Sequence, residues 1–370
     1  MKRLISLLLP LIFIFTSLPS ATAAENVVYL ISKPHQLFDG SFRNDELVND
    51  LLPTGRLGKP LDTKPRGKRT WVIDGQLLDE IADMADGYDL NSGKETSGEV
   101  AAKSWLSRLA LMTSADKIIA LPYGNPDLSL AKRSAPSELR FYSSFGAERV
   151  RFHLNRQITI DNSRVWSKGV SRLSPQLRKK YTQNRQALTA LSTVINAPEV
   201  RAQRAKLAIL LSPSLNKNDR NFFSYNADGG VAATLNKLRV SAGKYQIASE
   251  TGQVPVTVIN AFDTPVEINL ELTPLNSRVQ VSDISKLTIG ANSRTQLSVP
   301  FSAIAPGSTI VLAQITNLKG GSVGPAAQLS INITFFNSQV AWFTIGAALL
   351  LFAAALFQNI RRFRRRRNEK

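Results

Sequence analysis

Cysteine is absent from the 370 residues, and histidine occurs only twice. The missing thiols exclude disulfide bonds, cysteine nucleophiles, cysteine–zinc sites and a lipoprotein-type lipid anchor. Two histidines restrict any zinc site to mixed histidine and carboxylate ligands. The sequence also has no phosphate-cradling glycine loop, no His-Glu-x-x-His, no nucleophile elbow and no solenoid-period repeat. We therefore expect no cofactor, and hydrophobic cores must stabilise the chain.

One long stretch has no charge at all. Residues 340–357 contain no ionisable side chain and a single hydroxyl, that of Thr344. A helix of this length spans roughly the hydrocarbon thickness of a bilayer. The basic tail that follows favours the cytoplasmic side, which argues against a buried core helix. We expect one transmembrane helix at 339–358 and a cytoplasmic tail at 359–370. The arginines expected at the membrane surface are Arg361, Arg362, Arg364, Arg365, Arg366 and Arg367.

The first residues have the pattern of a secretory signal peptide. Lys2 and Arg3 precede an apolar core, and the small residues of Ala21-Thr22-Ala23 suit cleavage after residue 23. An uncleaved signal anchor is the weaker alternative, because the apolar core is short. Residues 24–338 are therefore expected outside the cell, on a single-pass protein of the cell membrane.

Positive charge is concentrated in one region. Residues 134–244 carry 19 Lys and Arg against 6 Asp and Glu, whereas the regions on either side are almost neutral. Polyanions outside a cell are anionic lipid headgroups and cell-wall polymers, and the scarcity of aromatic residues among these charges argues against nucleic acid. A solvated helical surface explains the same charge without a ligand. The candidate polyanion-binding residues are Arg178, Lys179, Lys180, Arg201, Arg204 and Lys206.

Residues 24–133 alternate strand and helix. Short apolar runs at 27–31, 71–73 and 118–121 are typical of buried parallel strands, and helical spacing of apolar residues predicts two helices between the second run and the third, at 77–88 and 101–112. This βαβ pattern predicts an α/β layer. Three strands cannot close a barrel, so the layer is complete in itself or part of a larger unit.

Polar residues follow each of the three strands. His35, Asp74 and Asp127 could divide acid and base roles over a sugar or bind a metal, because parallel sheets place chemistry at their carboxyl edge. Tyr123 and Asn125 are further candidates for a cleft at this edge. Helix capping explains the aspartates without catalysis. Asp74 stands directly before a helix, and Asn125-Pro126-Asp127 resembles an N-cap, first-turn proline and second helical residue.

Several motifs in this region resemble a known family. They are Ser-Lys-Pro-His-Gln-Leu at 32–37, Trp-Val-Ile-Asp-Gly-Gln-Leu-Leu at 71–78, Met-Ala-Asp-Gly-Tyr at 84–88, Trp-Leu at 105–106 and Ala-Leu-Pro-Tyr-Gly-Asn-Pro-Asp at 120–127. They resemble an actinobacterial family of membrane-anchored secreted proteins without an assigned function, whose genes tend to lie beside that of the lipid II flippase. The resemblance implies a reduced sugar-hydrolase-like barrel, since relatives have more α/β units. Family members usually have proline at the position of Gly75 and an acidic residue at that of Asn125, and both departures argue against catalysis.

The remaining regions change pattern. A helical hairpin is expected in the basic segment 134–244, where Ser174-Pro175 opens an amphipathic helix and a second helix stops at Pro213. Residues 245–338 switch to strand alternation, with seven runs separated by turn residues. This spacing predicts an immunoglobulin-like β-sandwich next to the membrane.

The fold class expected is thus a multidomain α+β protein: an α/β domain (24–133), a basic helical region (134–244), a sandwich (245–338) and one transmembrane helix. The function expected is a non-catalytic binding or scaffolding protein of the cell envelope, linked to cell-wall biogenesis. Its partners would be the membrane, wall polymers, and the lipid II flippase or other wall-synthesis proteins. The alternative is an envelope carbohydrate-active enzyme, hydrolase- or deacetylase-like, that uses His35, Asp74 and Asp127.

Overall fold

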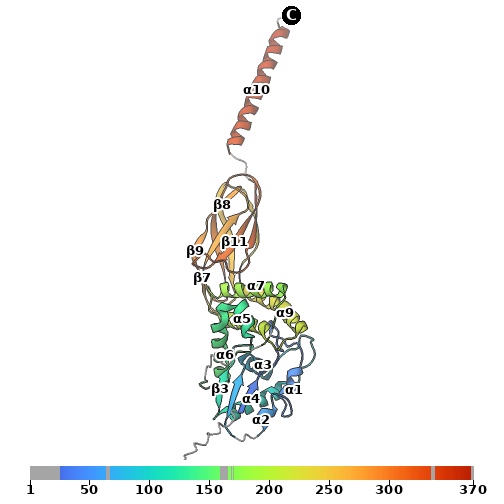
Figure 1. Ribbon diagram of the computed structural model, residues 1–370. Helices are drawn as coiled ribbons and strands as arrows, with labels where there is room; N and C mark the ends of the chain where they lie inside the picture. The colour runs from blue at the N-terminus through green and yellow to red at the C-terminus, as the bar shows by residue number, and fades with distance from the viewer. Residues whose placement is uncertain are drawn as a thin grey trace, which may run out of the picture.

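The computed structural model describes residues 26–63, 67–158, 166, 167, 169, 171–334 and 338–367, with side chains in the last helix only over 342–361. The expected signal peptide (1–23), the side chains of Arg362 and residues 364–367, and the residues 368–370 lie outside this description. The described chain is elongated, with an α/β layer at one end, a helical layer, a β-sandwich and a terminal helix (Figure 1).

The α/β layer is an open parallel sheet of order β1-β2-β3 in the described residues. Its strands are β1 (Asn26–Leu30), β2 (Arg69–Ile73) and β3 (Lys117–Ala120). The helices of this layer are α1 (Glu46–Leu51), α2 (Lys59–Asp62), α3 (Gly75–Asp86) and α4 (Glu99–Thr113). One face of the sheet packs against them around the fully buried Trp71 and Trp105. The three predicted strands and the two predicted helices, α3 and α4, are confirmed, whereas α1 and α2 were not predicted.

The helical layer contains the predicted hairpin and additional helices, but the second helix of the hairpin is α-helical only to Lys206 and continues as a 3-10 helix to Leu211. Its elements are α5 (Leu128–Ser134), η1 (Pro136–Glu138), α6 (Leu139–Leu154), α7 (Pro175–Leu191), α8 (Pro198–Lys206), η2 (Leu207–Leu211) and α9 (Lys217–Leu235). Helix α7 begins as predicted, with Pro175 in its first turn and the Ser174 hydroxyl accepting from Leu177 N at 3.3 Å. Helix α6 instead packs back on the first layer, because Ala147 and Val150 lie in the α/β core.

The β-sandwich consists of two facing sheets, of order β4-β6-β10-β8 and β5-β12-β11-β7-β9. Its strands are β4 (Leu238–Val240), β5 (Gly243–Ile247), β6 (Thr251–Asn260), β7 (Val266–Pro274), β8 (Val279–Val281), β9 (Ile284–Ile289), β10 (Ser293–Ala303), β11 (Gly307–Thr316) and β12 (Ala327–Ile333). Inward side chains of both sheets share one core. Strands β4 and β5 were missed, since each is short and β4 begins only three residues after α9. The sandwich therefore starts at Leu238, within the stretch expected to be helical.

The sandwich and the helical layer are joined by a common core. Four residues from the end of α7, the start of α8 and the turn between them are buried among the sandwich residues: Leu191, Ile195, Ala197 and Val200. Asn317 Nδ2 also donates to Thr193 Oγ1 at 2.9 Å. The two bodies thus pack directly, and the sandwich separates the helical layer from the terminal helix (Figure 1).

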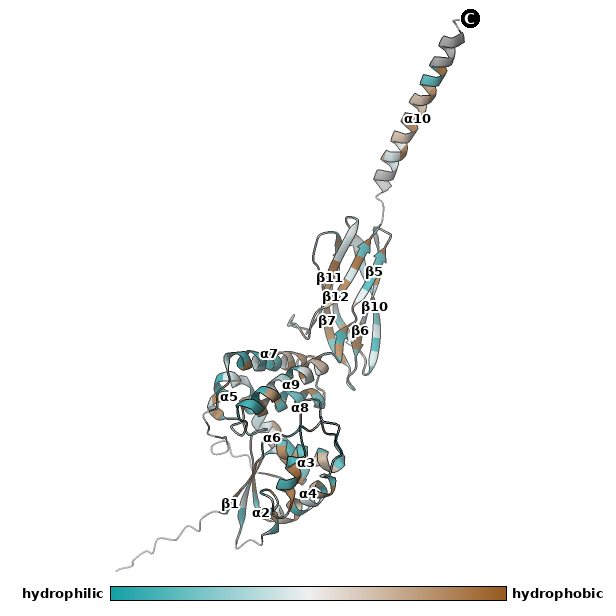
Figure 2. Ribbon diagram, turned by 90° about the vertical axis from the view of Figure 1, so that its right-hand side faces the viewer, coloured by the Kyte–Doolittle hydropathy of each residue, from teal (hydrophilic) through white to brown (hydrophobic). Residues whose placement is uncertain are grey.

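The terminal helix α10 (Ser338–Arg367) stands apart from the rest of the molecule (Figure 2). Its stretch Trp342–Arg361 has a mean hydropathy of 1.9 and none of it is buried, so it is long and apolar enough to cross a membrane. An unburied apolar helix of this length fits single-pass membrane anchoring.

Candidate functional site

Helix α6 closes the carboxyl edge of the sheet. A side chain at Gly146 would meet Leu121 O at 2.2 Å and Tyr123 N at 2.7 Å, and one at Gly75 would meet Gly146 O at 2.8 Å. Only glycine permits this approach of α6 to the ends of β2 and β3. The place where a parallel sheet usually keeps its active site is therefore covered by a helix.

Asp74 lies under this cover as the predicted N-cap of α3. Its Oδ1 accepts from Gln76 N and from Gly124 N, both at 3.0 Å, and the residue is 1% exposed. Burial raises the pKa of Asp74 to about 7, although the two backbone hydrogen bonds oppose this shift. Its Oδ2 has no partner among the described atoms. The carboxyl group is thus partly protonated near neutrality and is buried.

Asp127 is itself the N-cap of α5, and this corrects the prediction that it is the second helical residue. Its Oδ1 accepts from Leu130 N at 3.0 Å, and its Oδ2 accepts from Ser171 N at 3.4 Å. Asn125, the residue expected to cap, instead adopts a left-handed conformation with φ of 45°. The left-handed turn at Gly124 and Asn125 delays the helix start, so capping passes to the next suitable side chain.

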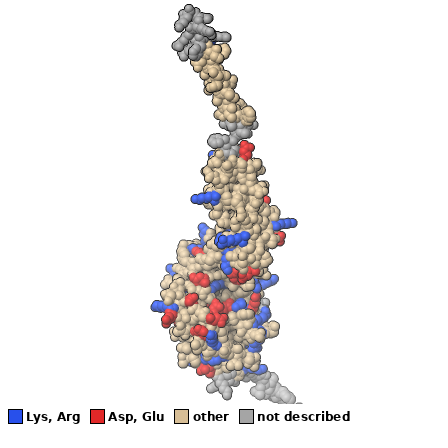
Figure 3. All heavy atoms as spheres, turned by 180° about the vertical axis from the view of Figure 1, so that it is seen from behind, with Lys and Arg blue, Asp and Glu red and all other residues tan. Residues whose placement is uncertain are grey.

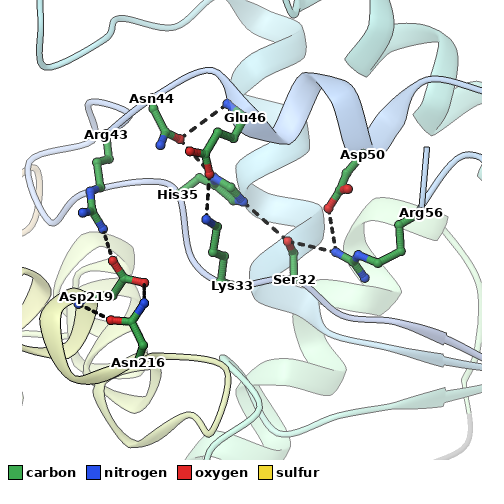
Figure 4. A network of polar contacts seen from close by, with 10 residues as sticks. All are labelled: Ser32, Lys33, His35, Arg43, Asn44, Glu46, Asp50, Arg56, Asn216 and Asp219. Carbon is green, nitrogen blue, oxygen red and sulfur yellow. Dashed lines mark hydrogen bonds and ion pairs between the residues drawn. The ribbon is translucent and has the colours of Figure 1, made fainter.

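His35 lies in a separate pocket of about 470 Å³ at the end of β1. Its ring Nδ1 is 3.4 Å from Asn44 Oδ1, and its Nε2 is 3.5 Å from Ser32 Oγ (Figure 4). The pocket walls hold two ion pairs, Lys33–Glu46 at 2.6 Å and Arg56–Asp50 at 2.7 Å. Burial lowers the pKa of His35, so the imidazole is neutral at pH 7.

The structure does not bring the three catalytic candidates together. Among the described residues no hydrogen bond or ion pair joins His35, Asp74 and Asp127, and each has its own neighbours. The described part of the chain also holds no group of three histidine or acidic side chains that suits a metal ion. Of the strand-end residues, Asn125 is buried, and only Tyr123 reaches a cleft.

That cleft, of about 730 Å³, lies between the α/β layer and the helical layer. Tyr123 OH donates to Asp79 Oδ2 at 2.9 Å, and Asp79 Oδ1 also contacts Arg149 Nε at 2.7 Å and His153 Nε2 at 2.6 Å. Tyr123 packs edge to face with Phe145, with ring centroids 5.1 Å apart. Both faces of the cleft therefore carry fixed polar groups beside aromatic rings.

The buried side chains of Glu80 and Lys206 both bind the chain at residues 35–37 beside the cleft. Glu80 Oε1 accepts from the backbone N atoms of His35 at 3.0 Å and Gln36 at 2.9 Å. From the facing layer, Lys206 Nζ donates to Gln36 Oε1 at 2.8 Å and Leu37 O at 2.7 Å. Burial raises the pKa of Glu80 and lowers that of Lys206, so each resists ionisation.

The loop at residues 35–43, which contains Gln36 and Leu37, makes three further contacts. Gln203 Nε2 donates to Phe38 O at 2.6 Å, Phe38 N donates to Asn226 Oδ1 at 2.7 Å, and Arg43 pairs with Asp219 at 2.5 Å (Figure 4). Residues 35–43 thus connect the two layers. Sequence reasoning missed Asp79 and Glu80 as structural groups. The available signal was the position of Glu80 between Leu77 and Met84, on the apolar stripe of α3.

Most of the candidate polyanion-binding residues have partners within the protein. Lys180 pairs with Asp228, Arg201 with Glu148 at 2.6 Å and Arg204 with Glu138 at 2.8 Å. Arg178 and Lys179 are exposed, and no ion pair holds either in the described residues. In the C-terminal tail, Arg361 is exposed at the end of the apolar stretch.

Solved structures of other proteins match this chain over about a quarter of its length. WR4, an MSP family member from C. elegans, is 10% identical, covers 26% of this chain and 98% of its own, and has a TM-score of 0.22. E. coli alpha-2-macroglobulin is 21% identical, with 26% and 6% covered and a TM-score of 0.22. A non-cellulosomal cohesin from Archaeoglobus fulgidus is 19% identical, with 29% and 96% covered and a TM-score of 0.18. At these scores none of them informs on function.

A comparison with curated proteins gives no match. A family does match, over residues 94–368, which run from the loop before α4 to the end of α10. This range covers part of the α/β layer, the helical layer, the sandwich and the terminal helix. The chain therefore belongs to the family of unknown function DUF6049.

Proposed function

We propose that this protein is a non-catalytic, membrane-anchored binding or scaffolding protein of the cell envelope, with its folded layers outside the cell. The observation that carries the proposal is that both aspartates considered as catalytic candidates are buried helix caps. Asp74 and Asp127 are each 1% exposed and cap helices, and α6 covers the sheet edge next to Asp74. A hydrolase acting on carbohydrate needs two carboxyl groups on either side of one open site. The carbohydrate-active alternative therefore has less support.

The binding site proposed is the 730 Å³ cleft between the α/β and helical layers. Clefts between packed bodies are common ligand sites. Several of its charged groups are ion-paired, as in Asp79–Arg149 and Glu148–Arg201, and these fixed charges would orient a polar ligand. A wall-derived polar molecule or an extended segment of a wall-synthesis protein suits this lining, and the lipid II flippase is the partner that the family resemblance suggests.

The sandwich acts as a spacer in this proposal. A strand of ten residues such as β11 extends about 33 Å, several times the screening length of physiological salt. The exposed Arg178 and Lys179 lie in the helical layer, on the far side of the sandwich from α10. Their accessible polyanion is therefore a cell-wall polymer rather than the headgroups around the protein's own anchor.

Complementation of a deletion strain tests the proposal. The triple variant His35→Gln, Asp74→Asn and Asp127→Asn keeps both capping acceptors and removes any acid or base. We expect it to restore the wild-type phenotype, whereas a chain without α10 is not expected to restore it. A triple variant that folds, reaches the membrane and fails to complement would establish the enzyme instead.

A further inference from the structure

The chain leaves the sandwich toward α10 at one defined end. Ile333, the last residue of β12, pairs with Gly307, the first residue of β11. The end of β10 is only four residues earlier in the chain, at Ala303. The end of the sandwich that carries these residues is the one from which the chain continues to α10 (Figure 1).

Two large apolar side chains are exposed at this end. Leu275 is 58% exposed and Ile304 is 62% exposed, and they lie in two different connections. The connections are bonded to each other, because Ile304 N donates to Arg278 O at 2.8 Å and Arg278 Nη1 donates to Pro306 O at 2.6 Å. We call residues 275–278 and 304–307 together the anchor-side tip.

The short linker to α10 is enough to keep the anchor-side tip close to the membrane. The five steps from Ile333 to Ser338 span at most about 18 Å when fully extended. The apolar stretch of α10 opens with Trp342, which is 77% exposed. Tryptophan is typical of the membrane–water interface, so Trp342 marks the level of the headgroups.

The opposite end of the sandwich offers an internal contrast. Leu318 is 53% exposed in the β11–β12 connection, beside the helical layer that Asn317 contacts. It is the single large apolar side chain that is strongly exposed at that end of the described sandwich. Similar exposure therefore occurs at both ends of the described sandwich, but only the anchor-side end carries two such side chains.

We propose that the anchor-side tip rests on the bilayer, with Leu275 and Ile304 inserted among the lipid headgroups and Arg278 beside the phosphates. Apolar residues with a neighbouring basic group suit this interface, because the apolar part is buried while the charge stays with water and phosphate. Such contact holds the sandwich upright and fixes the distance of the cleft from the membrane. The inference rests on the anchoring by α10 in the proposed function.

A fluorescent label tests this, since the native chain has no cysteine to compete for it. The full-length protein is placed in nanodiscs that contain brominated lipids, with one introduced cysteine in each variant. Ser277→Cys puts an exposed label on the tip, Lys319→Cys puts one at the opposite end, and Leu350→Cys puts one within α10. We expect strong quenching at 277 and 350 and at least tenfold less at 319.

The side chains are tested in the Ser277→Cys background by adding Leu275→Ser and Ile304→Ser. Both positions are exposed, so the fold is expected to persist, and quenching at 277 is expected to fall severalfold. Quenching at 350 without quenching at 277, or quenching at 277 that the serine pair leaves unchanged, would overturn the inference. Equal quenching at 277 and 319 would also overturn it, because the molecule would then lie flat. Absence of quenching at 350 would reject the anchoring itself.

Discussion

The two layers farthest from α10 and the sandwich bury different kinds of residue. The α/β and helical layers bury ionisable side chains, among them Asp74, Glu80, Glu138 and Arg220. In the described sandwich, the buried polar residues are only Asn260, Thr309 and Thr316, and its surface carries few charges (Figure 3).

Buried charge costs free energy unless it is paired and hydrogen-bonded. In the α/β and helical layers, buried ionisable groups join segments that are distant in the sequence, as Lys206 does with the loop at residues 36–37. The sandwich needs no such contacts, because alternating strands fill its core. In the proposed function, selective binding belongs to the α/β and helical layers, and the sandwich sets their distance from α10.

The largest effect is expected from Lys206→Ala. Removing this amine leaves the buried acceptors Gln36 Oε1 and Leu37 O without their donor, at about 1–3 kcal/mol for each unsatisfied group, so we expect a loss of about 3–5 kcal/mol of stability. Urea unfolding followed by tryptophan fluorescence measures the loss in the two layers rather than in the sandwich, since Trp71 and Trp105 lie in the α/β core, Trp166 packs against the helical core and the sandwich has no tryptophan. The matched control is Lys244→Ala on the exposed face of β5, expected within about 0.5 kcal/mol of wild type. Equal losses of stability in Lys206→Ala and Lys244→Ala would contradict the distinction between layers stabilised by buried ionisable groups and a sandwich that is not.

The second-largest effect is a pH dependence of the free energy of unfolding that arises from Asp74. Its folded-state pKa, raised by burial to about 7, exceeds its ordinary value of 3.8, so the folded state binds the proton more tightly. The stability from this group is present below about pH 4 and is lost as the pH rises to about 7. A shift of this size, from 3.8 to about 7, corresponds to roughly 4 kcal/mol.

Asp74→Asn keeps a capping oxygen and does not titrate. We therefore expect the fluorescence-detected unfolding midpoint to fall less between pH 4 and pH 8 in this variant than in wild type. Circular dichroism of the β-sandwich signal is the control, because no group in that core gains or loses a proton. Identical slopes in the variant and wild type would show that Asp74 is not the titrating group.

Much of this fold is predictable from local pattern, and the cleft is not. Apolar runs predicted β1, β2 and β3, and alternation of apolar and polar residues predicted β7 and β12. The cap at Asp74 followed from its position before an apolar helix. These features depend on residues a few positions apart.

The candidate site depends instead on contacts between distant residues. Nothing near residue 206 indicates that its amine reaches residues 36 and 37, and nothing near Gly146 indicates that α6 covers the sheet edge. The Asp127 prediction failed for a related reason, because the turn at Gly124 and Asn125 follows from backbone conformation that the residue types permit but do not require.

A third, smaller effect is expected at Asp127. Alanine removes the acceptor for Leu130 N and Ser171 N, and a lost N-cap costs about 1–2 kcal/mol. Asparagine keeps an acceptor for Leu130 N and is expected to lie within about 0.5 kcal/mol of wild type. Urea unfolding of both variants measures the difference. An asparagine variant as unstable as the alanine variant would show that the charge, rather than the cap, matters at this position.

The smallest effect on stability is expected from the double variant Arg178→Ala and Lys179→Ala. Both side chains are exposed in α7 without an ion pair in the described residues, so unfolding should change by less than about 0.5 kcal/mol. Binding of the full-length protein to purified anionic wall polymer should nevertheless weaken severalfold, and the remaining binding should depend less on salt because exposed charges are screened. The matched control removes two basic side chains from the sandwich, Lys244→Ala and Arg294→Ala. Equal weakening by both pairs would show that binding follows net charge, whereas weakening by the α7 pair alone would place wall recognition in the helical layer.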